Sequence, residues 1–180
     1  MIITILAIFL WYTFSSLREG MLWSKKETFL TIPDHTYSML FIPISFCLVI
    51  AQTFVMFPII SMILTLLFVY TIVIREKLSV ANPKYFYYEW FDYHLVRAIE
   101  GGLFFIPCWI ILKDFFLLSA LWIIGNWIYK RVMNRVMYGH FSHKLTMTTY
   151  WMFGKPFPYS DRWYDWSLIL PAIYFLIKIL

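Results

Sequence analysis

Long apolar stretches separated by short polar segments run along the whole chain. A membrane-spanning helix needs about 20 mainly apolar residues, because each helical residue rises about 1.5 Å. The first such stretch covers residues 3–23. The stretch from Ser38 to Ile74 is long enough for two helices, and Pro58 divides it, because proline cannot sustain the helical hydrogen-bond ladder. We therefore expect a tight helical hairpin around Pro58.

The segment EWFDYHLVRAIEGG, residues 89–102, decides how the rest of the chain divides. If it is a loop, the following span carries Lys113 and Asp114 in mid-membrane. If it is helical, one span runs to Leu112, Lys113 and Asp114 form a turn, and another span begins at Phe115. The second division keeps most lysine and arginine on one side of the membrane, as the positive-inside rule requires. The pattern therefore predicts six spans: 3–23, 38–57, 59–75, 84–112, 115–137 and 164–180.

The composition supports this interpretation. Of the 180 residues, 62% are hydrophobic, 22% aromatic and 14% charged, whereas a soluble domain is about 45–50% apolar and about 25% charged. The apolar runs are long and do not alternate, which excludes a transmembrane barrel. The sequence predicts an all-α, polytopic transmembrane helical bundle, with residues 1–180 as a single integral membrane domain.

Charge indicates orientation and partners. The net charge of +5 would favour nucleic acid in a soluble protein, but in a membrane protein lysine and arginine mark cytoplasmic loops. We expect both termini outside and the basic loops in the cytoplasm. The expected partners are the lipid bilayer and either further copies of the chain or other membrane subunits, with no nucleic acid.

A set of charged side chains falls within the predicted fourth span. At about 100° per residue, Glu89, Arg97 and Glu100 share one helical face, and Arg97 and Glu100 are spaced to pair. Ionisable groups in a span normally face the bundle interior. In this hypothesis Glu100 or Glu89 carries a proton, Arg97 supplies the counter-charge, and His94 relays near neutral pH. The predicted ion or proton pathway comprises Glu19, Glu89, Asp92, His94, Arg97 and Glu100.

Histidines and carboxylates on the same predicted side indicate an alternative, a membrane metalloenzyme. His140 and His143 in the segment HFSH lie three residues apart, and imidazole with carboxylate suits a transition metal. The sequence contains no HExxH motif and no desaturase-type histidine box, so a place at the lipid headgroups, beside Arg135 and Lys144, is the favoured explanation of these two histidines. The predicted metal ligands are His94, Glu89, Asp92, His140 and His143, with Glu19 as a further candidate.

Three functions therefore stay open from the sequence. The first is the handling of ions, protons or a small solute. The second is a subunit or scaffold role in a membrane complex, which is compatible with the first. The third is metal-dependent catalysis. No motif in the chain identifies an enzyme class.

Overall fold

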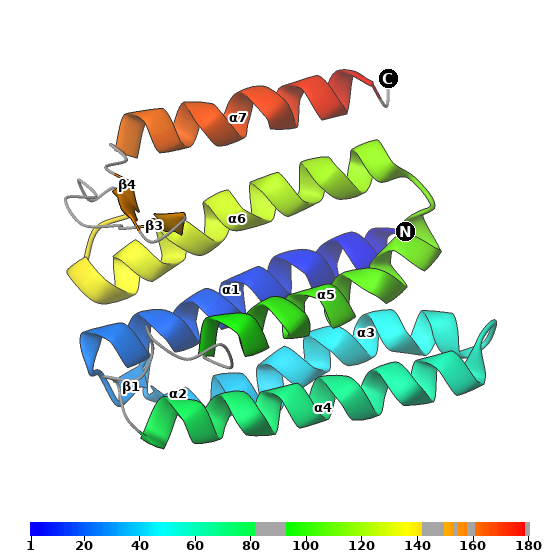
Figure 1. Ribbon diagram of the computed structural model, residues 1–180, viewed down its shortest axis with the longest axis horizontal. Coiled ribbons are helices and arrows are strands. Elements are labelled where there is room, and N and C mark those ends of the chain that lie inside the picture. Colours follow the sequence, from blue (N-terminus) through cyan, green and yellow to red (C-terminus); the bar gives the residue numbers. More distant parts are fainter. Residues whose placement is uncertain (82–92, 142–149, 153–154, 158–160, 179–180) are drawn as a thin grey trace.

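A computed structural model describes residues 1–81, 93–141, 150–152, 155–157 and 161–178, and it describes side chains over 1–78, 95–141 and 169–178. Helices dominate the described chain, which confirms the predicted all-α bundle (Figure 1). The elements in chain order are α1 (Ile2–Ser24), β1 (Thr28–Phe29), β2 (Ile32–Pro33), α2 (Asp34–Thr36), the π-helical turn η1 (Tyr37–Phe41), α3 (Ile42–Phe54), α4 (Pro58–Ala81), α5 (Tyr93–Leu112), α6 (Phe115–Tyr138), β3 (Tyr150–Met152), β4 (Lys155–Phe157) and α7 (Asp161–Ile177).

Four helical segments of the described chain are long and apolar enough to cross a bilayer. The predicted span 115–137 matches α6 to within one residue, and the predicted span 164–180 overlaps α7, which begins at Asp161 and ends at Ile177. However, α6 carries three basic residues in its second half, and α7 has only 17 residues. An integral membrane location follows from the apolar helices, whereas the count of six spans stays a prediction. The four segments are Ile2–Ser24, Asp34–Phe54, Pro58–Leu78 and Leu95–Leu112.

The two predicted turns are present. Helix α3 ends at Phe54 and α4 begins at Pro58, so proline opens the second helix of the hairpin. Between α5 and α6, Lys113 has a left-handed backbone with φ 53°. Asp114 caps α6 by accepting a hydrogen bond from the Leu117 backbone N–H at 2.9 Å, which satisfies a donor that the helix itself leaves free.

One predicted helix end differs clearly from the structure, and the start of another predicted span lies outside the described residues. The helix predicted over 59–75, with Arg75 as its last residue, continues to Ala81 and so also contains Glu76. The prediction stopped there because charge ends an apolar run, but the structure buries both side chains. Helix α5 is described from Tyr93, so the first part of the predicted span 84–112 lies outside the described residues.

The helices form a stack in which α1 and α5 lie between α6 on one side and α3 with α4 on the other (Figure 1). Helices α1 and α6 run parallel, because Tyr12 contacts Asn126 while Gly20, further along α1, lies against Val136 further along α6. Close packing depends on glycine: a Cβ atom on Gly20 would lie 2.7 Å from the Val136 Cβ. Small residues of this kind let membrane helices approach closely.

Aromatic side chains fill the core between these helices. Trp11 of α1 stacks on Phe104 of α5 with ring centroids 4.9 Å apart, and Phe46 of α3 stacks on Phe68 of α4 at 4.0 Å. The outer face of α4 exposes apolar side chains such as Leu66, which is 70% exposed. Lipid is the solvent that makes such a face stable.

Candidate functional site: a buried charged layer

Charged side chains from α1, α4 and α5 gather near one end of the bundle. This is the end at which α1, α4 and α6 finish and α3 and α5 begin. Arg75 lies within the apolar segment Pro58–Leu78, and Glu100 lies within the apolar segment Leu95–Leu112. From the helical rise, Arg75 is roughly 26 Å from the start of α4, and Glu100 is roughly 18 Å from the end of α5. The buried members of this charged layer are Arg18, Glu19, Arg75, Glu76 and Glu100.

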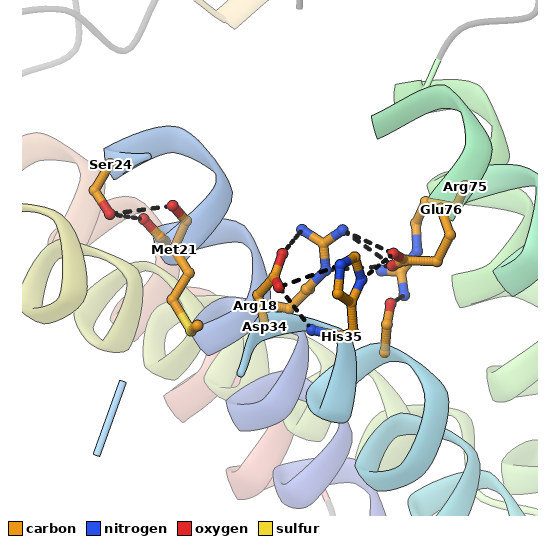
Figure 2. Close-up of polar contacts among 9 residues, drawn as sticks. Arg18, Met21, Ser24, Asp34, His35, Arg75 and Glu76 are labelled. Carbon is orange, nitrogen blue, oxygen red and sulfur yellow. Dashed lines mark hydrogen bonds and ion pairs between the residues drawn. The ribbon is translucent and has the colours of Figure 1, made fainter. Parts of the chain in front are cut away.

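The first pair joins α1 to α4. Arg18 Nη2 lies 3.0 Å from Glu76 Oε1 and 3.1 Å from Glu76 Oε2, and Arg18 Nε donates to Oε1 at 3.2 Å. This forked geometry is among the strongest that arginine and carboxylate form. Asp34 Oδ2 lies 3.8 Å from Arg18 Nη1, and His35 Nδ1 lies 3.2 Å from Glu76 Oε2 (Figure 2). The His35 side chain is 64% exposed, so this cluster extends from the bundle interior to its surface.

The β1–β2 hairpin supplies the surface part of the cluster. It returns the chain from α1 through the pairs Thr28 with Pro33 and Phe29 with Ile32. Asp34 follows directly and opens the helical segment that becomes α3. The hairpin thereby places Asp34 and His35 beside the last turns of α1 and α4.

The second pair joins α4 to α5. Arg75 Nε lies 3.1 Å from Glu100 Oε2, and Arg75 Nη2 donates to Ser38 Oγ at 2.7 Å. Both charged side chains are almost wholly buried, with exposures of 1% and 0%. The predicted pairing of Arg97 with Glu100 is therefore wrong: the ion-pair partner of Glu100 is Arg75, on a neighbouring helix.

The third pair joins α1, α5 and α6. Arg97 forms an ion pair with Glu19 and donates a hydrogen bond to the Tyr129 hydroxyl, which in turn donates to Glu19 Oε2. The Arg97 guanidinium also lies 4.3 Å from the centroid of the Tyr129 ring, a cation–π distance. With this pair, three arginines and three glutamates are matched one to one.

A cleft of about 660 Å³ begins beside the third pair. It lies between α5 and α6, and α1 contributes side chains to its wall. Arg97 and Tyr129 belong to its lining, which also includes Asn126, whose amide donates to the Tyr12 hydroxyl at 3.2 Å. The remaining lining is mainly aromatic or small, as Trp11, Phe105, Trp122, Gly101, Gly102 and Ser119 show.

The structure brings three of the predicted pathway residues, Glu19, Arg97 and Glu100, into this layer. Glu89 and Asp92 lie outside the described residues. His94 lies in the first turn of α5, but its side chain is outside the described part. Their roles stay predictions.

The residues of the predicted metal site also lie partly outside the described part of the chain. His140 is exposed just beyond the end of α6, and His143 lies outside the described residues. Among the side chains that are described, no group of three or more histidine, cysteine, aspartate or glutamate residues is arranged to hold a metal ion. A transition-metal cofactor therefore stays a prediction that depends on Glu89, Asp92, His94 and His143.

The sequence interpretation missed Arg18, Arg75 and Glu76. Arg18 had a signal, because it precedes Glu19 within the first apolar span, where any charge is costly. Arg75 and Glu76 end an apolar run, which is also where a loop begins, so the sequence alone placed Arg75 at the end of the predicted span 59–75 and Glu76 beyond it. Only the contact with α1 and α5 identifies them as buried.

Comparisons with known protein families, with curated proteins and with solved structures found no match. The fold and the charged layer define the class: an all-α membrane helical bundle with ion-paired charges buried between its helices. An assembly with further subunits or copies stays a prediction.

Proposed function

We propose that the protein handles protons within the membrane, with Glu100 as the group that takes up and releases the proton. The observation that carries this proposal is the environment of Glu100. Its side chain is wholly buried, its ion-pair partner is Arg75, and neither carboxylate oxygen accepts a hydrogen bond from the described residues. Buried carboxylates are normally hydrogen-bonded, because desolvation is costly. An ionisable group in a span is by default a functional candidate.

Arg75 suits the role of counter-charge. Its guanidinium stays protonated under any physiological condition, so it stabilises the ionised form of Glu100 whenever the proton leaves. The hydrogen bond from Arg75 Nη2 to Ser38 Oγ also helps to hold the guanidinium in place. This assigns to Arg75 the part that the sequence alone gave to Arg97.

A polar connection leads from the surface toward this pair. His35 is exposed and contacts Glu76, and Glu76 and Arg75 both contact Ser38. An imidazole ring can accept a hydrogen bond at one nitrogen and donate one from the other, so His35 is suited to pass protons between water and the carboxylates. His35 therefore takes the relay role for which the sequence indicated His94.

The experiment is proton flux into proteoliposomes that contain a pH-sensitive dye, driven by a potassium gradient with valinomycin. Glu100→Gln keeps the size of the side chain but cannot titrate, so we expect flux to fall to that of protein-free liposomes. Glu27→Gln is the matched control, because Glu27 is exposed at the same end of the bundle, and it should leave flux unchanged. Equal flux in the wild type and Glu100→Gln, or wild-type flux no greater than in empty liposomes, would contradict the proposal.

A further inference from the structure

We infer that the cleft between α5 and α6 binds a flat, uncharged amphipathic molecule from the lipid phase, with carbonyl oxygens on its ring. A quinone with an apolar tail has this chemistry. This site lies beside the proposed proton site and does not depend on it, because it concerns binding alone.

The size and shape of the cleft fit such a molecule. A volume of about 660 Å³ lies within the roughly 300–1,000 Å³ that is usual for small-molecule sites. The cleft is open beside Gly102, where an added Cβ atom would meet no other atom within 4 Å. The rings of Trp11, Phe105 and Trp122 line the walls, and aromatic faces favour stacking on a planar partner over contact with a flexible chain.

The electrostatics of the cleft favour an uncharged ligand. Arg97 is the charged residue of the lining, and Glu19 already balances it. A full negative charge on the ligand would therefore compete with Glu19 for the same guanidinium. A neutral ring with oxygen acceptors leaves the ion pair intact.

A buried donor in the cleft calls for an acceptor. Trp11 lines the cleft and is 4% exposed, and its indole Nε1 has no hydrogen-bond partner among the described residues. Indole N–H is a donor only, and buried donors are normally paired. The Nε1 atom is covered by protein, so a carbonyl oxygen of the ligand would satisfy it only after the indole ring turns toward the cleft.

The position of the cleft indicates entry from lipid. Trp122 lines the cleft and is 52% exposed. The cleft also runs along α5, where its lining residues Gly102 and Phe105 lie within Leu95–Leu112, a segment apolar enough to cross a bilayer. A ligand that enters at this depth must first dissolve in the hydrocarbon, so it requires an apolar tail.

The test is quinone binding to the full-length protein in nanodiscs. A benzoquinone with a decyl chain is titrated while tryptophan fluorescence is recorded, with empty nanodiscs and free tryptophan as references. We expect saturable quenching. Gly102→Phe fills the cleft and should weaken binding by at least about tenfold. Trp11→Phe keeps the ring but removes the N–H donor and should also weaken binding.

The matched control is Ile106→Phe, which adds a ring on the same helix one turn further along, at a side chain that is 44% exposed and outside the cleft lining. It should bind as the wild type does, and circular dichroism checks that all variants fold. Quenching that is unsaturable, or equally strong in Gly102→Phe and Ile106→Phe, would overturn the inference. Displacement of the quinone by a moderate excess of phospholipid would overturn it too, because a lipid would then be the occupant. Proton flux is not read, so this outcome is independent of the proposed function.

Discussion

The Arg75–Glu100 pair offers a direct test of how buried charge is stabilised in this bundle. Arg75→Met keeps an unbranched, though shorter, side chain but removes the charge, and so leaves Glu100 buried without its ion-pair partner. The double change Arg75→Met with Glu100→Met removes both charges and fills the same space with apolar atoms. The two variants therefore separate the cost of an unpaired charge from the value of the pair.

The magnitude follows from the burial of the two side chains, 1% and 0% exposed. Removing one partner of a buried pair costs about 3–5 kcal/mol, whereas replacing both with apolar residues is often neutral or stabilising. On insertion scales, a charge at the centre of a membrane helix costs about 2.5–3.5 kcal/mol, which is close to the cost of removing one partner of a buried pair. We therefore expect about 3 kcal/mol for Arg75→Met, where the two ranges meet.

The assay is reversible unfolding in mixed micelles of mild detergent and sodium dodecyl sulfate, followed by circular dichroism. Lys77→Met is the control, because Lys77 lies on the same helix two residues away and is exposed. It should change the free energy of unfolding by less than about 0.5 kcal/mol. The double variant should recover most of the loss that Arg75→Met causes, with a coupling energy above about 2 kcal/mol.

Additive losses would refute this reasoning. If the loss of stability in the double variant equals the sum of the losses that Arg75→Met and Glu100→Met cause separately, the two side chains do not depend on each other. The burial of charge then has another explanation. A loss for Arg75→Met no larger than that for Lys77→Met would refute it equally.

Two further predictions concern helix packing and helix ends, and both are read in the same unfolding assay. Gly20→Ala should lower the free energy of unfolding by about 1–3 kcal/mol, because its methyl group would overlap Val136. Gly102→Ala is the control: its methyl group meets open space, so stability should not fall. Equal effects of the two changes would show that the close approach at Gly20 does not limit packing. Asp114→Ala should lower the free energy of unfolding by about 0.5–2 kcal/mol, because the Leu117 N–H loses its acceptor. Asp114→Asn keeps an acceptor oxygen, so its stability should stay close to that of the wild type. Equal losses in both variants would mean that the cap adds little.

Local features of the sequence were sufficient to predict most of the helices. The length of an apolar run, the division at Pro58 and the turn at Lys113 and Asp114 depend on neighbours in the chain, so the sequence contains them directly. The same applies to the presence of Glu19, Arg97 and Glu100 within apolar segments. A charge inside a span is costly, so each of these residues was identifiable as a member of a buried site.

The partners of these charges were decided by tertiary structure. Spacing along one helix paired Glu100 with Arg97, but the rotation of α4 against α5 presents Arg75 to Glu100, and α1 presents Glu19 to Arg97. An ion pair between helices depends on their register and rotation, which are set by the packing of aromatic and glycine surfaces over the full length of the bundle. The sequence by itself therefore determined that this protein buries charge in a membrane bundle, and only the folded arrangement decided which charges meet and where a cleft remains.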